Sequence, residues 1–375
     1  MYIKPGSMLG MLGGGQLGRM FAMAAQQMGY RVTVLDPAAE SPAGSIAERH
    51  LQADYLDAQA LHELGATCAA ITIEFENVPA QALRTLAQRC VVSPDADSVS
   101  IAQNRILEKE FLAGNNFPVG LFIVIHNAQD IHQIDPALFP AILKISQFGY
   151  DGKGQIRIDK AEDLPEAFSN LGNRPCVLEK RLPLDREISV ILARDRLNQI
   201  TFFPIPENRH EQGILDTSII PATLSDEITA KACELAGQIA SKLNYIGILC
   251  VEFFVLEDDR ILINEIAPRP HNSGHYSLNA CITSQFEQQV RMLCGLPHGS
   301  TRLIQPAVMT NILGDLWKNG EPAWNEILCH PQAKLHLYGK RAAKPGRKMG
   351  HFTVLAETIE EALQHTQRIR QDLQR

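Results

Sequence analysis

Two acidic residues lie in neighbouring apolar segments of the chain. Glu252 falls in the run at 248–254, and Glu265 falls in the run that begins at residue 261, after a polar turn at 257–260. We expect these runs to be adjacent β-strands, so that both carboxylates project from one face of the sheet. Mg²⁺ takes such carboxylates together with the phosphates of a bound nucleotide, and Mn²⁺ also suits them. The pair therefore predicts a metal site; two solvated acids on a hairpin are the alternative.

A glycine-rich segment at 148–155 could close over the phosphates of that nucleotide. Apolar strand residues precede it at 141–145 and follow it at 156–158, so we expect a hairpin flap rather than the strand-to-helix turn of a Walker loop. Its glycines let the backbone approach phosphates closely, and Lys144 and Lys153 could neutralise their charge. An ordinary mobile loop is the alternative, which the two lysines disfavour.

Two further segments carry groups that suit a nucleotide. The segment 176–182 is an apolar strand that runs into a polar turn, and its backbone could bind a purine while Glu187 accepts hydrogen bonds from ribose hydroxyls. The basic run at 340–348 lies on an expected turn between two strands. Arginine and lysine side chains there suit a phosphate monoester, with a solvated turn as the alternative.

The N-terminal segment carries a different glycine pattern. Gly13, Gly15 and Gly18 follow an apolar strand and open a helical pattern, and Asp36 ends the next strand. This is the arrangement of a dinucleotide fingerprint, in which the free N–H groups at the start of the helix attract a phosphate. An NAD-dependent oxidoreductase is therefore an alternative, although many α/β folds share the turn without binding a dinucleotide. It also leaves the flap, the glutamate pair and the basic run unexplained.

The length, charge and cysteine content of the chain limit the kinds of protein that can carry these candidate residues. The chain has 375 residues, a net charge of −7 and eight cysteines, and no two cysteines form a CxxC pair. Such a chain is expected to form two or three domains, to bind no nucleic acid over its general surface, and to keep its thiols buried and reduced. No apolar run is long enough to span a bilayer. We expect a cytoplasmic protein whose partners are small molecules, not nucleic acid or membrane.

The pattern of apolar residues divides the chain into three regions. Strands and helices alternate in 1–98, which predicts a small doubly wound domain. The region 99–295 begins with a helix expected over 101–113 and continues with strands paired around polar turns, the texture of an α+β domain. The region 296–375 ends in an amphipathic helix over 359–373, whose apolar stripe should pack on a core.

Several strings of residues, taken in order, closely resemble the 5-(carboxyamino)imidazole ribonucleotide synthase family of ATP-grasp enzymes. They are GGGQLGRM at 13–20, EFENV at 74–78, FGYDGKGQ at 148–155, NEIAPRPHNSGH at 264–275 and PGRKMGH at 345–351. The resemblance spans nearly the whole chain. It implies a Rossmann-like pre-ATP-grasp domain, a central ATP-grasp domain that holds ATP between two subdomains, and a small C-terminal domain. It also implies a homodimer.

The resemblance implies a carbon–nitrogen ligase of purine biosynthesis. Bicarbonate attacks the γ-phosphate of ATP to give carboxyphosphate and ADP, and carboxyphosphate or its CO₂ carboxylates the exocyclic amine of aminoimidazole ribonucleotide. The formate-dependent ATP-grasp glycinamide ribonucleotide transformylase is the nearest alternative, because it has a similar PRPH segment. The run at 272–275, Asn264 and the flap residues Tyr150 and Asp151 favour the carboxylase.

Carried over to matching positions, the resemblance assigns residues to roles. ATP would be bound by Arg105, Lys144, Gly149, Tyr150, Asp151, Gly152, Lys153, Gly154, Gln155, Glu179, Lys180, Arg181, Leu182, Glu187, His210, Asn264 and Glu265. The ribonucleotide and bicarbonate would be bound by Gln16, Glu74, Tyr150, Asp151, Arg269, His271, Asn272, Lys340, Arg347 and Lys348. Lys153, Arg269 and Asn272 would act in catalysis, and Glu252 and Glu265 would hold Mg²⁺. Many relatives have lysine at position 105, so the arginine departs from the pattern but keeps its charge.

Overall fold

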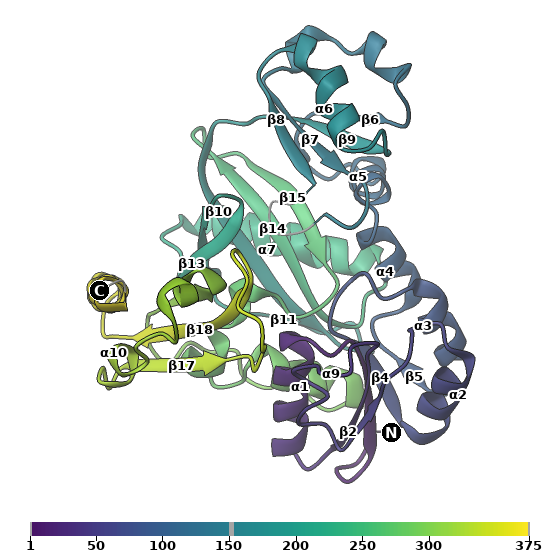
Figure 1. Ribbon diagram of the computed structural model, residues 1–375, viewed down its shortest axis with the longest axis vertical. Helices are drawn as coiled ribbons and strands as arrows, with labels where there is room; N and C mark the ends of the chain where they lie inside the picture. The colour runs from purple at the N-terminus through teal and green to yellow at the C-terminus, as the bar shows by residue number, and fades with distance from the viewer. Residues whose placement is uncertain (1, 150–153, 374–375) are drawn as a thin grey trace.

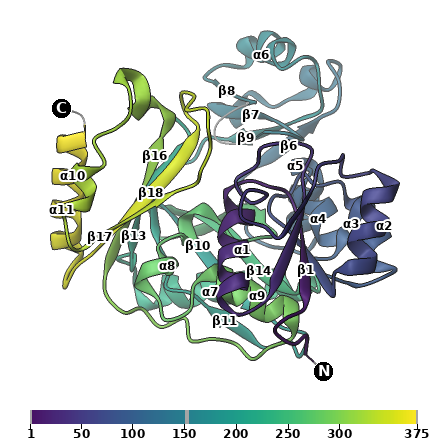
Figure 2. The same ribbon diagram turned by 60° about the horizontal axis from the view of Figure 1, so that its bottom comes forward.

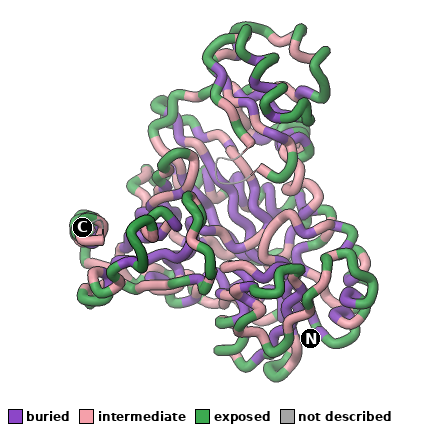
Figure 3. Tube along the Cα trace, in the orientation of Figure 1, coloured by how far each residue is buried: buried purple, intermediate pink, exposed green. Residues whose placement is uncertain are grey.

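The computed structural model describes residues 2–149 and 154–373, whose strands form three β-sheets (Figure 1). A parallel sheet lies in the N-terminal region, a small antiparallel sheet forms the upper lobe in Figure 1, and a large antiparallel sheet occupies the centre and the C-terminal region. Figure 3 shows that buried residues run along the central sheet and into both other parts. The predicted mixture of α/β and α+β architecture is confirmed.

The N-terminal sheet has the strand order β3-β2-β1-β4-β5, and every pair in it is parallel. Its three central strands are mostly apolar and buried because helices cover both faces, whereas the two edge strands are partly exposed. The loops after β1 and β4 leave the same edge of the sheet, which brings the first glycine-rich turn beside the loop at 74–78. The elements are β1 (Met8–Leu12), α1 (Gln16–Gln27), β2 (Arg31–Leu35), β3 (Arg49–Leu51), α2 (Ala58–Thr67), β4 (Ala70–Ile73), α3 (Ala80–Ala87) and β5 (Val91–Val92).

The expected single helix over 101–113 is wrong. The chain forms α4 (Ala96–Ala102) and then a separate helix α5 (Arg105–Gly114). Asn104 separates them because its backbone is extended and its side chain accepts a hydrogen bond from the N–H of Ile106 at 2.9 Å, as an N-cap does. Arg105 therefore occupies the first turn of a new helix.

The upper lobe contains the antiparallel sheet β6-β9-β7-β8, covered by one helix and short 3₁₀ turns. β7 and β8 pair from Ala141 opposite Ile158 to Lys144 opposite Gln155, so the predicted hairpin strands are confirmed. The flap residues 150–153 lie outside the described residues. The elements are β6 (Phe122–Ile125), η1 (Asp130–Gln133), η2 (Pro136–Leu138), β7 (Ala141–Ile145), β8 (Gln155–Ile158), η3 (Ala161–Asp163), α6 (Leu164–Asn170) and β9 (Cys176–Lys180).

The large sheet runs in the order β15-β14-β10-β12-β13-β16-β18-β17, with β11 paired to β10. The C-terminal strands thus continue the central sheet instead of forming a sheet of their own. The strands are β10 (Leu184–Arg194), β11 (Ile200–Phe202), β12 (Glu207–Glu211), β13 (Ile214–Ile220), β14 (Gly247–Leu256), β15 (Ile261–Ala267), β16 (Ala307–Leu313), β17 (Ala333–Leu337) and β18 (Lys348–Leu355).

Helices cover this sheet and join it to the N-terminal region. Val290 on α9 packs in the same core as Leu9 and Phe21, and Figure 2 shows α9 beside α1. Ile369 of the last helix is buried against Val308 of β16, so the apolar stripe is core packing as predicted. The helical elements are α7 (Asp226–Lys242), η4 (Asn272–Gly274), α8 (Ser277–Ala280), α9 (Gln285–Cys294), η5 (Gly314–Asn319), α10 (Asn325–Leu328) and α11 (Ile359–Leu373).

The expectation of buried thiols holds for five of the eight cysteines; Cys90 and Cys233 are partly buried, and Cys329 is exposed. All eight cysteines are unpaired, and burial raises the pKa of buried thiols such as those of Cys176 and Cys281, which keeps these thiols protonated. Within the described part of the chain, no helix combines the length and the apolar character that crossing a membrane requires.

Two histidines are fully buried where the segment after β15 meets the C-terminal strands. The ring centroids of His275 and His351 lie 5.0 Å apart, and Tyr338 Oη lies 2.9 Å from His351 Nδ1. Burial, followed by nearby positive charges, lowers the pKa of His275 well below its usual value, and burial does the same for His351. Both rings are therefore held neutral in the folded protein.

We expect the free energy of unfolding to fall as the pH drops below the ordinary histidine pKa of 6.5, because only the unfolded chain then protonates His275 and His351. Each histidine should contribute a loss of roughly 1 kcal/mol between about pH 6.5 and about pH 5.5. Urea unfolding at both pH values measures this loss. His351→Phe should lose less than the wild-type protein, whereas a variant of the exposed His126, His126→Gln, should lose as much; equal losses in all three would contradict the prediction.

Candidate active site

Glu252 on β14 and Glu265 on β15 lie directly opposite each other in the antiparallel pairing of the two strands. The predicted placement on one face of a hairpin is confirmed. One carboxylate oxygen of each glutamate and a ring nitrogen of His271 lie within 4.8 Å of one another. Burial and then the negative charge of Glu265 raise the pKa of Glu252 above its usual range. Two carboxylates in this position repel each other unless a cation joins them.

The donor set around this pair fits Mg²⁺. Asn264 precedes Glu265, and its Oδ1 atom is buried without a hydrogen-bond partner among the described residues. Two carboxylates and an amide oxygen are the hard ligands that Mg²⁺ or Mn²⁺ prefers. His271 Nδ1 accepts a hydrogen bond from the N–H of Ser273 at 3.3 Å, which leaves Nε2 to carry the ring proton 3.5 Å from Glu252 Oε1. The structure therefore places His271 beside the Glu252–Glu265 pair.

Cations surround the buried carboxylate of Glu179, on β9. Lys144 Nζ donates a hydrogen bond to Glu179 Oε2 at 3.0 Å, and Lys109 Nζ lies 3.6 Å from the same oxygen. Arg105 Nη1 lies 4.0 Å from Oε1. Burial alone would raise the pKa of Glu179, but these positive charges outweigh it and hold the pKa at about 2. Arg105 also donates to Glu265 Oε2 at 3.3 Å, so one guanidinium joins the cations around Glu179 to the Glu252–Glu265 pair.

His210 and Glu187, which are predicted to contact the nucleotide, lie within electrostatic reach of Glu252. His210 Nδ1 on β12 lies 3.2 Å from Glu187 Oε2 on β10, and Glu187 raises the pKa of His210 although burial opposes it. The side chains of Lys180 and Arg181 lie elsewhere: Lys180 Nζ donates to the carbonyl of Ala137 at 3.0 Å, and Arg181 pairs with the exposed Asp159. At 180 and 181 the side chains therefore have other partners, and a purine would contact the backbone.

The described part of the flap shows why glycine is needed at its base. Gly154 has φ +73°, and a Cβ atom there would lie 2.4 Å from Ile145 Cδ1. The pairing of Lys144 with Gln155 places the lysine on the strand that enters the flap. Gly149, the last described residue before the flap tip, follows this strand. Tyr150, Asp151, Gly152 and Lys153 lie outside the described residues.

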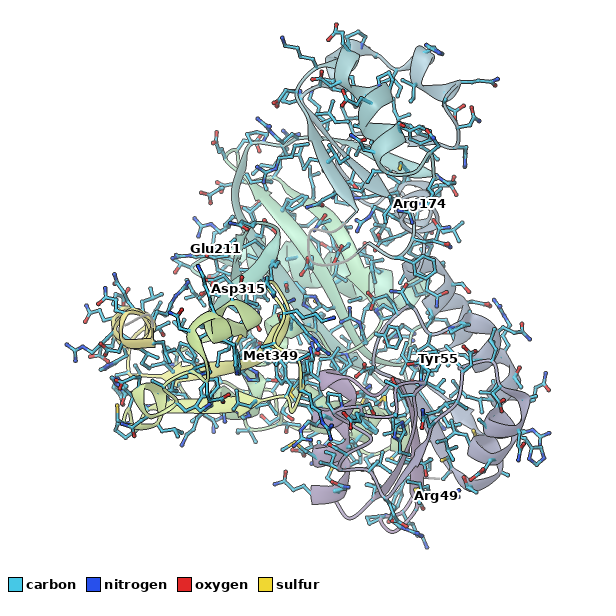
Figure 4. All side chains as sticks on the ribbon, viewed as in Figure 1. Arg49, Tyr55, Arg174, Glu211, Asp315 and Met349 are labelled. Atoms are coloured by element: carbon cyan, nitrogen blue, oxygen red, sulfur yellow. The ribbon has the colours of Figure 1, made fainter. Side chains whose placement is uncertain are left out.

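The first glycine-rich turn holds carboxylates of the protein itself. Glu74 Oε2 accepts a hydrogen bond from the N–H of Gly18 at 2.8 Å, and a Cβ atom on Gly15 would lie 2.3 Å from Glu74 Oε1. Asp36 Oδ2 accepts from the N–H of Gly14 at 2.7 Å and from Tyr55 Oη at 2.9 Å (Tyr55 is labelled in Figure 4). Glu74 thus occupies the position that the pyrophosphate has in a dinucleotide site, and the hydrogen bonds of Asp36 stabilise the turn. This arrangement removes the support for a dinucleotide site.

Glu74 is a weak acid in this environment. Burial raises its pKa to about 7, although the N–H groups of Gly18 and Gly15 stabilise the ionised form. Gln16 is the first residue of α1 and lies on the same turn, as the sequence predicts. The positive charge of Lys340 also favours the ionised form of Glu74, which places the C-terminal basic turn within electrostatic reach of this loop.

The basic turn joins β17 to β18. Lys340 Nζ donates to the carbonyl of Lys348 at 2.7 Å, and Arg347 Nη1 donates to the carbonyl of Ala342 at 2.8 Å. Lys348 begins β18, next to Met349, which Figure 4 labels, and its charge stabilises the ionised form of Glu252. Lys340 therefore acts on the loop of Glu74 and Lys348 on Glu252 of β14, whereas Arg347 is exposed.

Arg269 and Asn272 are both engaged by protein partners. Arg269 Nε is hydrogen-bonded to Glu76 Oε2, and both side chains are mostly buried. Asn272 and Asn311 exchange two amide hydrogen bonds, at 3.0 Å and 2.7 Å. Arg269 thus links the segment after β15 to the loop that carries Glu74, and Asn272 links the same segment to β16.

Sequence reasoning missed three of these residues. Lys109 follows Arg105 by four residues, which places the two on one face of α5, and this spacing could have revealed it. Glu76 lies in the EFENV string that carried the resemblance. Asn311 has no local signal, because only the folding of β16 beside β13 brings it to Asn272.

Family models match three successive parts of the chain. The ATP-grasp domain matches residues 110–286, the ribonucleotide synthetase preATP-grasp domain matches 7–103, and the phosphoribosylaminoimidazole carboxylase C-terminal domain matches 307–365. N5-carboxyaminoimidazole ribonucleotide synthase of Bacillus subtilis is 42% identical over 363 residues, which is 96% of this chain and 95% of that protein. The chain belongs to the N5-carboxyaminoimidazole ribonucleotide synthase family. This is the ATP-grasp family that the sequence strings resemble.

Solved structures of N5-carboxyaminoimidazole ribonucleotide synthase family members have the same fold. The Staphylococcus aureus enzyme complexed with ADP is 41% identical with a TM-score of 0.91, and the alignment covers 98% of both chains. The Aspergillus clavatus enzyme in complex with ADP and 5-aminoimidazole ribonucleotide is 34% identical with a TM-score of 0.89, over 98% of this chain and 99% of that one.

We expect Glu76→Gln to lower the free energy of unfolding by roughly 2–4 kcal/mol, because it leaves the guanidinium of Arg269 without its charged partner. Urea unfolding measures the change. Glu234→Gln is the matched control: Glu234 pairs with Lys231 at 3.0 Å on a half-exposed surface, so its loss should stay below about 1 kcal/mol. Similar small losses in both variants would show that the Arg269 pair does not stabilise the fold.

Proposed function

We propose that the protein uses ATP and bicarbonate to carboxylate the exocyclic amine of 5-aminoimidazole ribonucleotide, releasing ADP and phosphate, in purine biosynthesis. The observation that carries this proposal is the convergence of the Glu252–Glu265 pair and the cations around Glu179, joined by Arg105. Phosphoryl transfer needs such charge neutralisation and positioning more than covalent help. Membership of the family supports the identity of the acid and of the amine.

ATP would lie between the flap sheet and the β14–β15 hairpin. Lys144 and Arg105 face this space and would contact phosphates, with the flap from Gly149 to Gln155 closing over them. The backbone at 179–182 would bind adenine, while Glu187 and His210 would lie against the ribose. Glu252, Glu265 and Asn264 would hold Mg²⁺, or Mn²⁺, which neutralises charge on the phosphates when bound.

Bicarbonate would be positioned beside the γ-phosphate by residues that follow the metal hairpin. Its oxygen attacks phosphorus, the bond to the β,γ-bridging oxygen breaks, and ADP leaves with carboxyphosphate remaining. Arg269 would balance the charge of bicarbonate, and a bidentate anion suits its planar guanidinium. Asn272 and Lys153 would complete this group, with His271 nearby. The amine nitrogen then forms a bond to the carboxyl carbon of carboxyphosphate. The bond between this carbon and the phosphate oxygen breaks, phosphate leaves, and the nitrogen loses a proton.

The ribonucleotide would lie between the N-terminal loops and the basic turn. Gln16 and Glu74 would contact the imidazole or its ribose, with Tyr150 and Asp151 of the flap above them. Lys340, Lys348 and Arg347 would bind the 5′-phosphate. The electrostatic effect of Lys340 on Glu74 and of Lys348 on Glu252 supports a pocket that these lysines share. Excluding water from this pocket would protect carboxyphosphate from hydrolysis.

The organisation of the chain completes the proposal. We infer domains at 1–98, 99–295 and 296–375, which the three family matches support in order and approximate extent. The first boundary falls within α4 and the second falls at Gly295, the left-handed residue that ends α9. We also propose a cytoplasmic homodimer whose partners are small molecules, as the family resemblance implies.

ADP release should be strongest when bicarbonate and aminoimidazole ribonucleotide are both supplied with MgATP. A coupled assay that measures ADP with each component omitted tests this expectation, and replacement of bicarbonate by formate with glycinamide ribonucleotide tests the transformylase alternative. ADP release that needs neither bicarbonate nor ribonucleotide would refute the proposed function. Release that depends on formate would assign the chain to the alternative reaction.

A further inference from the structure

The strand that carries Glu265 lies at the edge of the central sheet. β15 pairs with β14 on one side, and the register shifts between Glu252 and Phe253, which leaves Asn264 as the extra residue of a β-bulge. A bulge interrupts the ladder of hydrogen bonds, and an edge strand has backbone groups without a neighbouring strand. On its outer side β15 meets the segment 118–119 at Ile263, whose N–H donates a hydrogen bond to the carbonyl of Pro118 at 2.8 Å. Glu265 lies beyond this contact, directly after the bulged residue Asn264.

Side chains from α5 form hydrogen bonds with the backbone of this edge strand on both sides of Glu265. Glu108 Oε1 accepts a hydrogen bond from the N–H of Ile266, and Lys109 Nζ donates to the carbonyl of Asn264 at 3.0 Å. Both side chains are buried: Glu108 is 3% exposed and Lys109 is 1% exposed. One residue before Glu265 and one residue after it are thus held by adjacent residues of a single helix.

The same helix also contacts the flap sheet. The N–H of Arg105 donates to the carbonyl of Ser146, directly after β7, at 2.8 Å. Lys109 Nζ, which holds the carbonyl of Asn264, also lies 3.6 Å from Glu179 Oε2. α5 therefore connects the strand of Glu265 with both strands that carry Lys144 and Glu179.

We propose that Glu108 and Lys109 are positioning residues that fix the Glu265 carboxylate for the metal–nucleotide complex by holding the backbone on either side of it. This inference rests on the proposed function. Stabilisation of the fold alone is a poor explanation, because burying an ionisable pair in place of apolar side chains contributes little to stability. Groups that orient metal ligands, in contrast, commonly change metal affinity by about 10–100-fold when they are removed.

Glu108→Leu removes the acceptor for the N–H of Ile266, whereas Glu108→Gln keeps an acceptor oxygen. Glu110→Leu is the matched control, because Glu110 lies on the exposed face of α5. Calorimetry of ADP binding, with and without Mg²⁺, measures how much the metal increases nucleotide affinity. We expect Glu108→Leu to reduce this Mg²⁺-dependent increase roughly tenfold, while ADP affinity without metal changes less than about threefold.

Glu108→Gln should restore most of the Mg²⁺-dependent increase, and Glu110→Leu should leave it unchanged. Lys109→Met should act in the same direction as Glu108→Leu, and it carries the test if Glu108→Leu does not fold. Titration of Mn²⁺ by its electron paramagnetic resonance signal gives a second readout without turnover. Equal loss of ADP affinity with and without metal in the folded variants would overturn the proposal. A failure of the proposed function is detected separately, because the wild-type protein would then release ADP at the same rate with and without bicarbonate and ribonucleotide.

Discussion

Buried charge is the constraint on which the site depends. Glu252 is buried and lies opposite Glu265, whose side chain is 35% exposed, and like charges this close are costly where a medium of low polarity screens them weakly. Glu179 is also buried, but Lys144 and its neighbouring cations hold it ionised. Arg105 contacts both Glu265 and Glu179, so the charge balance of one sheet is tied to that of the other.

Polar and charged contacts join the N-terminal loop and the C-terminal strands to this charged centre. Glu76 brings the N-terminal loop to Arg269, Asn311 brings the C-terminal strands to Asn272, and Lys348 acts on Glu252. Glu76 belongs to the N-terminal region, whereas Asn311 and Lys348 lie on the paired strands β16 and β18 of the C-terminal region. The site therefore lies at a junction, where small movements of one region can change the position of a side chain supplied by another.

Local patterns gave reliable predictions where the structure is itself local. The hairpin of Glu252 and Glu265, the flap between β7 and β8, and the stripe of α11 follow from apolar periodicity and turn residues over short spans. The single helix over 101–113 was wrong because one side-chain cap at Asn104 outweighed a continuous helical pattern. The first glycine turn misled for a different reason, because its partner Glu74 lies far away in the sequence.

The sequence by itself determined the types of group, their order and the family to which they belong, because strings such as NEIAPRPHNSGH keep their ligands within a few residues of one another. Only the tertiary structure decided which charges meet. Arg105 and Glu265 are 160 positions apart, Arg269 and Glu76 are 193 positions apart, and Asn272 meets Asn311 through the order of strands in a sheet. Charges at such separations are brought together by the packing of the hydrophobic cores and sheets, which no local pattern of side chains encodes.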